Sequence, residues 1–250
     1  MTFQPHTHFL RISPDALRET CPGFPATVGA PAGHVAVPVP MDAGHFRYGA
    51  YARSFKRLFD IIAASVAIVL SAPVMALLAF ALWIEGGRPF YTQLRLGRDG
   101  RQFRMLKLRS MVHDAEARLA ECLAADPLLR QEWECSQKLK CDPRITPLGA
   151  FIRKTSLDEL PQLFNVLRGD MSLVGPRPML PDQLPLYLYP QSYLALRPGL
   201  TGLWQVTARN DQSFEMRAIL DRHYGRRVTL WGDLRIMLAT VRAVVCATGY

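Results

Sequence analysis

Two adjacent acids, Asp158 and Glu159, are the strongest candidates for chemistry in this sequence, and basic residues such as Arg153 and Arg168 surround them. Paired carboxylates can divide the work on a phosphate: one attacks phosphorus, and the other holds a divalent cation that neutralises phosphate charge. The same residues also fit a structural interpretation. Ser156-x-x-Glu159 matches a capping box, and acids at the start of a helix satisfy unpaired N–H groups. The residues alone leave both interpretations open.

Two arginines on turn-rich loops extend the pattern. Arg177 stands between Pro176 and Pro178, and proline both fixes its own φ and restricts the residue before it. A rigidly placed guanidinium suits bidentate phosphate binding, although a stiff surface turn would use the same residues. Arg197, followed by Pro198, lies on a second loop of this kind. The histidines show no metal-ligand spacing, and the sequence contains no Ser/His/Asp set and no P-loop.

A short helix is expected to position the two acids. Apolar residues recur behind them at i, i+3, i+4 and i+7, which predicts a helix with one buried stripe made of Leu160, Leu163, Phe164 and Leu167. Pro161 must then lie in the first turn, and Gly169 is expected to end the helix. Asp158 and Glu159 would therefore sit at the helix N-terminus.

Three further elements can be predicted from local patterns. Residues 89–111 predict two short strands around the turn Gly97-Arg98-Asp99-Gly100. Residues 112–140 predict a charged helical stretch that is interrupted at Asp126-Pro127. Val228–Val245 predicts an amphipathic helix with Arg235 and Arg242 on its polar side. Such a helix would bind a membrane surface or pack against a protein core equally well.

The most apolar segment is Ile61–Ile84, which is 24 residues long and contains no charge. At about 1.5 Å per residue it is long enough to cross a hydrocarbon layer of about 30 Å. Pro73 near its middle favours a kink, and basic residues on both sides give no clear orientation under the positive-inside rule. Three arrangements remain open on these residues: a spanning helix, a re-entrant helix that bends at Pro73, and a buried core helix.

Composition sets wider limits. A chain of 250 residues fits one domain of ordinary size with appendages, and its net charge of +9 indicates an anionic partner. We expect no nucleic-acid partner, because no recognition motif is present and the long apolar segment argues against one. Five cysteines without a CxxC pair argue against a disulfide scaffold and a structural zinc site. Residues 1–50 hold seven prolines and five glycines and are expected to form a flexible tail.

Several of these motifs together resemble one protein family. The motifs are KRLFD (56–60), a proline-broken apolar segment, KLRSM (107–111), TSLDELPQLFNVLRGDMSLVGPRP (155–178) and RPGLTGLWQVTAR (197–209). In this order and at these spacings they resemble the bacterial sugar transferases, the monotopic polyprenyl-phosphate hexose-1-phosphate transferases. The resemblance covers about residues 53–250.

The resemblance implies a fold and a location. The fold would be α+β and mainly helical, with a re-entrant membrane helix in residues 51–88 that breaks at Pro73. Residues 89–250 would form a small cytosolic catalytic domain with amphipathic surface helices and a helical insertion at 112–141. The protein would lie at the cytoplasmic face of the cell inner membrane, in contact with its lipid, and could form a homodimer. One departure from some relatives is Ala72 before Pro73, which places the serine at Ser71.

The resemblance also implies a reaction. Relatives transfer a sugar-1-phosphate from a UDP-sugar to undecaprenyl phosphate, release UMP and need Mg²⁺, as the initiating step of exopolysaccharide or capsule synthesis. The insertion at 112–141 and the ending ATGY resemble the galactose-type enzymes, so we favour galactose over glucose. A docked scaffold that kept the fold and lost activity is the alternative from another class, but it would have no need for the acid pair.

Residue roles follow from the resemblance as well. Asp158 would be the nucleophile that forms a phosphosugar-aspartyl intermediate, and Glu159 would be the Mg²⁺ ligand. Nearby arginines would keep the Asp158 carboxylate ionised. The substrate-binding residues would be Lys107, Arg109, Arg153, Arg177, Arg197 and Asp221, where the role of Asp221 is left open.

Overall fold

The computed structural model describes residues 49–136, 139, 141–207 and 214–245, and it groups them into two compact units. One unit, Val112–Ile145, contains helices α3 (Ala115–Ala125) and α4 (Pro127–Ser136). The interruption expected at Asp126-Pro127 is confirmed. Asp126 explains it, because its Oδ1 accepts hydrogen bonds from the backbone N–H groups of Leu128 and Leu129, which starts the second helix.

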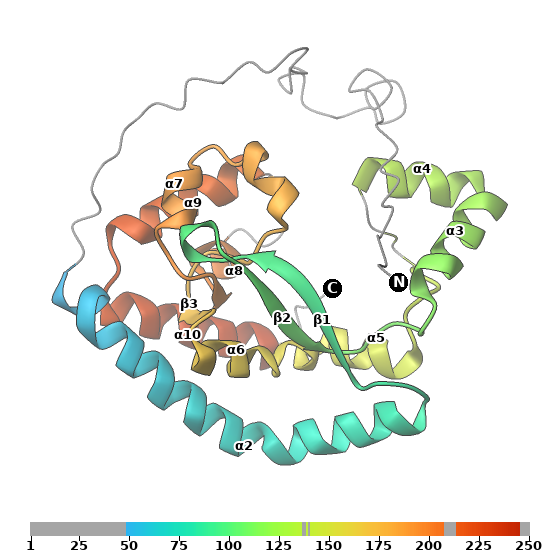
Figure 1. The fold of residues 1–250 in the computed structure, drawn as a ribbon, viewed down its shortest axis with the longest axis horizontal. Coiled ribbons are helices and arrows are strands. Elements are labelled where there is room, and N and C mark those ends of the chain that lie inside the picture. The colour runs from blue at the N-terminus through green and yellow to red at the C-terminus, as the bar shows by residue number, and fades with distance from the viewer. Residues whose placement is uncertain (1–48, 137–138, 140, 208–213, 246–250) are drawn as a thin grey trace, which may run out of the picture. The chain divides into compact units, whose positions relative to one another are not determined.

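The other unit holds the remaining elements and is mainly helical (Figure 1). Its long first helix is α2 (Lys56–Ile84), preceded by a π-helical turn at Tyr51–Phe55. The strands are β1 (Phe90–Leu96), β2 (Gln102–Leu108), β3 (Ser172–Val174) and β4 (Gly199–Thr201). The further helices are α5 (Pro147–Lys154), α6 (Gln162–Arg168), α7 (Pro190–Leu194), α8 (Leu203–Thr207), α9 (Phe214–Arg226) and α10 (Leu230–Val245). The predicted mainly helical α+β class is confirmed.

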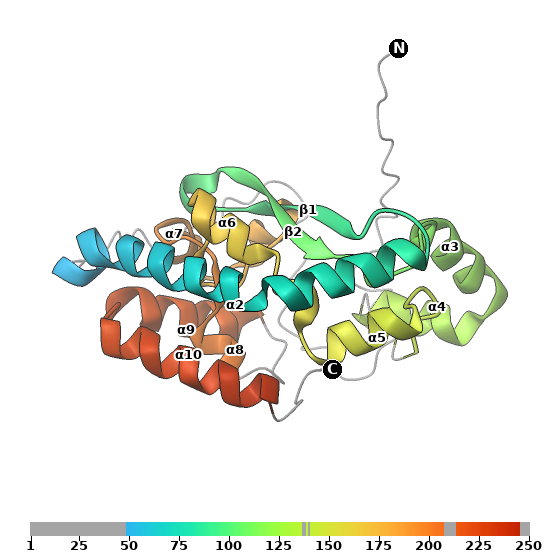
Figure 2. The same ribbon diagram turned by 90° about the horizontal axis from the view of Figure 1, so that it is seen from below.

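Helix α2 runs through Pro73 without interruption, but its axis changes direction near the middle (Figures 1 and 2). Proline cannot donate to the carbonyl one turn before it, and Ser71 adds to the local distortion. The Ser71 hydroxyl donates to the Ala67 carbonyl at 2.6 Å, a contact that bends helices. Ser71 therefore hydrogen-bonds to the helix backbone just before the bend, although Ala72, and not serine, directly precedes Pro73.

One face of α2 packs on protein and the other is apolar and exposed. Ala64, Leu78 and Leu82 are buried. Among the described residues, Tyr51–Ile84 is the one helix long and apolar enough to cross a membrane. Many of its exposed side chains are large and apolar, among them Ile62, Val66, Val69, Leu70, Leu77, Phe80, Trp83 and Ile84.

The predicted hairpin is confirmed. One side chain of helix α6 forms hydrogen bonds to its second strand. Strands β1 and β2 pair antiparallel, with Tyr91 opposite Lys107 and Arg95 opposite Phe103. The buried Asn165 of α6 accepts from the backbone N–H of Leu106 at 2.9 Å and donates to the carbonyl of Arg104 at 2.8 Å. The amide thus satisfies the free edge of β2 and holds α6 against it.

The expectation for α6 itself was partly wrong. Gly169 does end the helix, with φ 93° in the left-handed region. However, Pro161 precedes the helix, and the buried face consists of Gln162, Leu163, Asn165 and Val166. Phe164 is 40% exposed and is not part of a buried stripe. The helix is rotated because Asn165 must face β2.

Strands β3 and β4 pair in parallel and bring together the two loops that carry Arg177 and Arg197. Glycine is required at the crossing. A Cβ on Gly199 would lie 2.2 Å from the Gly175 nitrogen, and one on Gly202 would lie 2.2 Å from the Gly175 carbonyl oxygen. This close backbone contact fixes the start of the loop Gly175–Pro178.

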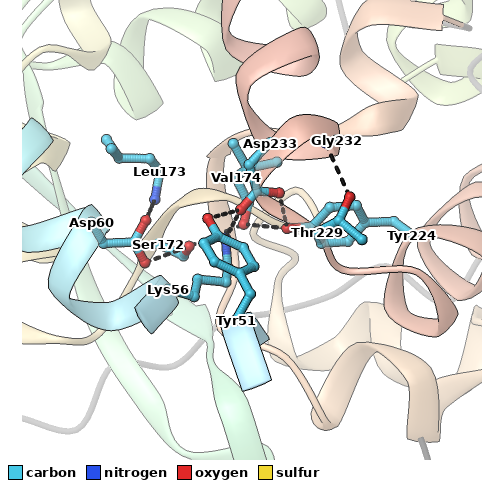
Figure 3. A network of polar contacts seen from close by, with 10 residues as sticks. All are labelled: Tyr51, Lys56, Asp60, Ser172, Leu173, Val174, Tyr224, Thr229, Gly232 and Asp233. Atoms are coloured by element: carbon cyan, nitrogen blue, oxygen red, sulfur yellow. Dashed lines mark hydrogen bonds and ion pairs between the residues drawn. The ribbon is translucent and has the colours of Figure 1, made fainter. Parts of the chain in front are cut away.

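A network of polar side chains connects the start of α2 to helices α9 and α10 (Figure 3). Asp233 of α10, fully buried, accepts from Tyr51 at 2.8 Å, from Lys56 at 2.6 Å and from Tyr224 of α9 at 2.7 Å. Next to it, Asp60 of α2 accepts from the Ser172 hydroxyl at 2.8 Å. These contacts link α2 to β3, α9 and α10.

Removal of the Asp233 carboxylate should strongly destabilise the packing of α2 against α9 and α10. In Asp233→Ala, Lys56 would stay mostly buried without its partner, which typically costs about 3–5 kcal/mol. We expect a clear fall in the free energy of unfolding in detergent, measured by denaturant titration. Glu215→Ala, at an exposed position on α9, is the control. An Asp233→Ala protein as stable as the control would contradict this role of the network.

Helix α10 confirms the predicted amphipathic element near the C-terminus. Asp233 and Ile236 face the protein, whereas Trp231, Leu238 and Val241 are 73, 71 and 60% exposed. Arg235 and Arg242 are exposed beside this apolar stripe. A stripe of this kind, with basic residues at its edge, is typical of helices that lie on a membrane surface.

Candidate active site

Asp158, Glu159 and Lys107 meet at one point. The Lys107 ammonium lies 3.1 Å from Asp158 Oδ2 and 3.0 Å from Glu159 Oε1. Asp158 is buried, with 8% of its surface exposed, and Glu159 is half-buried. The lysine comes from β2 and the acids come from the 3₁₀ turn Leu157–Glu159. The packing of this turn against β2 therefore brings the three groups together.

The backbone before the acids excludes the predicted capping box. Ser156 has φ 57°, in the left-handed region that non-glycine residues seldom occupy, and its side chain caps no N–H group. The Ser156 backbone carbonyl, and not its side chain, accepts a hydrogen bond from the Glu159 N–H at 3.2 Å. The structural interpretation of Ser156-x-x-Glu159 was therefore wrong. The sharp turn at Ser156 directs both carboxylates to Lys107 and away from the helix end.

The electrostatics of Asp158 differ from the sequence expectation. Burial raises the pKa of this carboxyl above its usual value, and the neighbouring Glu159 raises it further. The Lys107 ammonium and, more weakly, Arg153 lower it, but burial outweighs them. Arg153 is fixed nearby by a hydrogen bond from its Nε to the Ser110 hydroxyl at 2.9 Å. Lys107, and not the arginines, is the main group that favours the ionised form.

A second group of predicted residues meets elsewhere in the same unit. Tyr187 donates a short hydrogen bond to Asp221, and Arg217 Nε lies 3.9 Å from the same carboxylate. Arg217 also donates to the backbone carbonyl of Arg177. Burial raises the pKa of Asp221 to about 6, and the bond from Tyr187 and the charge of Arg217 oppose this shift. Arg217 thus links the backbone at Arg177 to Asp221.

Two predicted binding residues lie at helix ends instead. Arg109 donates to the Leu82 carbonyl at the end of α2 at 2.7 Å. Arg197 donates to the Gly169 carbonyl at the end of α6 at 3.0 Å. Cations at these positions satisfy carbonyls that have no partner within the helix. The structure does not bring either one to Lys107 and the acids, so their substrate-binding roles stay predictions.

Sequence reasoning missed Arg95, Arg217 and Tyr187. Each is a single residue in a strand, a helix or a loop, far from the others in sequence, and no local motif marks it. The signal is their convergence with Arg177 and Asp221, which requires the fold.

The acid pair is suited to a magnesium ion that a substrate completes. Within the described ranges, no three His, Cys, Asp or Glu side chains gather as a ready-made metal centre. Mg²⁺ is commonly held by one or two carboxylates, with substrate phosphates and water as the other ligands. One Asp158 oxygen and one Glu159 oxygen contact the same ammonium, so they converge on one position for a cation.

The fold and site together define a class of protein: one that carries a long exposed apolar helix and a pair of adjacent carboxylates, one of them buried, in contact with a lysine. The chain belongs to the bacterial sugar transferase family, because the model of that family matches residues 51–247. The resemblance deduced from the sequence motifs is thereby confirmed.

Named relatives agree with this assignment. An undecaprenyl-phosphate galactose phosphotransferase of Salmonella typhimurium is 48% identical over 198 residues, which are 79% of this chain and 42% of that protein. The exopolysaccharide production protein ExoY of Rhizobium meliloti is 45% identical over 78% of this chain and 87% of its own. An undecaprenyl-phosphate glucose phosphotransferase of Komagataeibacter xylinus is 36% identical over 75% and 35%. This chain thus spans less than half the length of the first of these relatives.

Proposed function

We propose that the protein transfers galactose-1-phosphate from UDP-galactose to undecaprenyl phosphate and releases UMP, as the first step of an exopolysaccharide or capsule. The observation that carries the proposal is the buried Asp158, paired with Glu159 through Lys107, in a chain of the bacterial sugar transferase family. Burial raises the pKa of Asp158, and a scaffold without activity would gain nothing from burying a carboxylate at that cost.

The chemistry would proceed in two displacements on one phosphorus. An ionised Asp158 oxygen attacks the β-phosphorus of the UDP-sugar, and the bond to the bridging oxygen breaks, so that UMP leaves with the electron pair. The product is an acyl phosphate, a mixed anhydride between the Asp158 carboxylate and the sugar-1-phosphate. An oxygen of the lipid phosphate then attacks the same phosphorus, and the Asp158 carboxylate is released with the electron pair. Each displacement conserves charge and needs no redox partner.

The neighbouring cations have separate tasks in this scheme. Lys107 holds both acids before the donor binds and then lies close to the phosphoryl oxygens on which charge develops. Arg153 adds positive charge beside Asp158. Glu159, with Asp158 near it, would hold Mg²⁺, which when bound supplies a positive charge that neutralises the donor's phosphates.

The same proposal places the protein at the cytoplasmic face of the inner membrane. Helix α2 would enter the bilayer, bend at Pro73 and return to the same side, and the apolar stripe of α10 would rest at the interface. Basic residues before and after α2 support this topology, since both ends are then cytoplasmic. Residues 89–250 would form the catalytic domain.

Labelling of single cysteines tests the topology. In a chain without its own cysteines, cysteines placed at Arg53 and at Arg88 should both react only with reagent on the cytoplasmic side of sealed vesicles. Reaction from opposite sides would show that α2 spans the bilayer and would rule out the re-entrant form.

The donor can be named by a direct assay. Full-length protein in detergent, supplied with undecaprenyl phosphate and Mg²⁺, should release UMP from UDP-galactose at a higher rate than from UDP-glucose or N-acetylated UDP-sugars. The preference for galactose rests on 48% identity to a galactose enzyme against 36% to a glucose enzyme. Faster release from UDP-glucose would reassign the sugar, and no release from any donor would remove the proposed activity.

A further inference from the structure

Arginines from three elements lie near one another: Arg95 from β1, the exposed Arg177 from the loop after β3, and Arg217 from α9, whose Nε lies 3.9 Å from Asp221. The charges of Arg177 and Arg217 both act on Arg95, and Arg217 donates to the backbone carbonyl of Arg177. The loop and the strand are tied together nearby, because the Leu96 N–H donates to the Met179 carbonyl at 2.9 Å. Their closeness is therefore a property of the fold.

Arg217 is fixed by aromatic rings. Its guanidinium lies 5.8 Å from the centroids of Tyr187 and Trp204 and 5.9 Å from that of Phe214. Arg217 is buried, with 8% of its surface exposed, yet its Nε has no hydrogen-bond partner among the described residues. Ring contacts of this kind hold an arginine in one orientation and leave its N–H groups for another ligand.

Arg95 is half-buried and also has unused hydrogen-bonding capacity. One terminal nitrogen donates to Gln93 at 2.6 Å, whereas the Nε is buried and has no partner. Burial lowers the pKa of Arg95, and the positive charges of Arg177 and Arg217 lower it further. The protein thus holds like charges together at an electrostatic cost.

Acidic side chains do not balance this charge. In the part of the chain that the structure describes, neither Arg95 nor Arg177 forms an ion pair, and Arg217 has Asp221 alone, at 3.9 Å. Asp221 is already engaged by Tyr187. Buried donors and uncompensated positive charge are stabilised by an anion that can accept several hydrogen bonds.

The arginine group is separate from the acid pair, but Arg95 and Lys107 lie on the same face of the hairpin. Tyr91, Gln93 and Arg95 share one face of the hairpin with Lys107, because Lys107 lies opposite Tyr91 and side chains alternate along a strand. Four residues of strand separate Arg95 from Tyr91, or about 13 Å. An anion at Arg95 would therefore be bound well away from the phosphorus attacked by Asp158.

We propose that Arg95, Arg177 and Arg217 form a second phosphate-binding subsite, distinct from the carboxylate pair and connected to it by one face of the β1–β2 hairpin. The phosphate would be part of the nucleotide or the headgroup of the lipid acceptor, and in this respect the inference rests on the proposed function. Guanidinium groups that converge from three elements match the oxygens of a phosphate, and a carboxylate nucleophile is not needed there.

Binding measurements without turnover test the subsite. Calorimetric titrations of full-length protein in detergent would use UMP as one ligand and farnesyl phosphate, a short polyprenyl phosphate, as the other. Arg95→Gln and Arg217→Gln should each raise the Kd of at least one ligand about tenfold or more. Arg104→Gln, an exposed arginine on the opposite face of the same hairpin, is the control and should bind as the natural protein does.

The pattern of losses identifies the source of the phosphate. Weaker binding of UMP alone assigns the subsite to the nucleotide, weaker binding of farnesyl phosphate alone assigns it to the lipid, and weaker binding of both indicates a shared subsite. If Arg217→Gln fails to fold, Arg217→Lys replaces it, and Arg95→Gln remains an independent test. Unchanged affinities in the folded variants, or no binding of either ligand by the natural protein, would overturn the proposal.

This result can be separated from the test of the proposed function. Arginine-dependent UMP binding without UMP release from any donor would retain the subsite and reject the transferase reaction. Normal release of UMP with unaltered binding in the arginine variants would do the reverse.

Discussion

Asp158→Asn should lower the rate of UMP release by at least about 10³-fold, because an amide cannot attack phosphorus as a carboxylate does. The replacement keeps the size of the side chain and removes its charge, so the fold should persist. With UDP-galactose and no lipid acceptor, the natural protein should gain the mass of a hexose phosphate, measured by mass spectrometry of the intact chain. Asp158→Asn should show no such gain.

Glu159→Gln is the matched comparison for this experiment. It changes the adjacent carboxylate in the same way but leaves the proposed nucleophile in place, so the mass adduct should still form, although more slowly. The structure argues against a capping role for these acids, because Ser156 is left-handed and caps nothing. An Asp158→Asn protein that melts normally and keeps full turnover would show that Asp158 is not the nucleophile.

Lys107→Met should reduce turnover at neutral pH by about 10²-fold or more. The lysine is the largest influence that lowers the pKa of Asp158 against burial and the charge of Glu159. Without it the pKa of Asp158 rises further, so a smaller fraction of the carboxyl is ionised at a given pH. The acid limb of the pH–rate profile should move to higher pH, and raising the pH should restore part of the activity.

Lys107→Arg separates charge from shape in this prediction. A guanidinium keeps the positive charge beside both acids, so the acid limb should stay near its original pH even if the rate falls through imperfect geometry. If Lys107→Met lowers the rate equally at every pH, the lysine acts on the transition state alone and does not control the ionisation of Asp158.

Local signals in the sequence were sufficient for much of the fold. Glycines at both ends of Gly97–Gly100 mark the hairpin turn, Asp126-Pro127 marks a helix start, and Gly169 marks a helix end, because each acts on backbone within a few residues of itself. The adjacent Asp158 and Glu159 were recognisable as a pair for the same reason. Their contact with Lys107, 51 and 52 residues away, was not predicted, because the resemblance to a family assigned Lys107 only to substrate binding.

The rest depends on contacts between distant segments. The periodicity of α6 suggested that Phe164 is buried, but the hydrogen bonds of Asn165 to β2 rotate the helix. The capping pattern at Ser156 was misleading, because the chain must turn sharply there to present the acids. Arg109 and Arg197 each donate one hydrogen bond to a carbonyl at the end of α2 or α6, which the sequence did not predict, and their substrate-binding roles stay predictions.

The network around Asp233 has a consequence for biosynthesis. Tyr51 and Lys56 precede their partner by 182 and 177 residues, so the ribosome makes the start of α2 long before α10 exists. At roughly 5–20 residues per second, this interval lasts roughly 9–35 s. In the proposed topology, α2 would therefore meet the bilayer before Lys56 can pair with Asp233, and α10 would pack onto it last. A nascent chain arrested before α10 would therefore contain α2 without the hydrogen bonds from Tyr51 and Lys56 to Asp233.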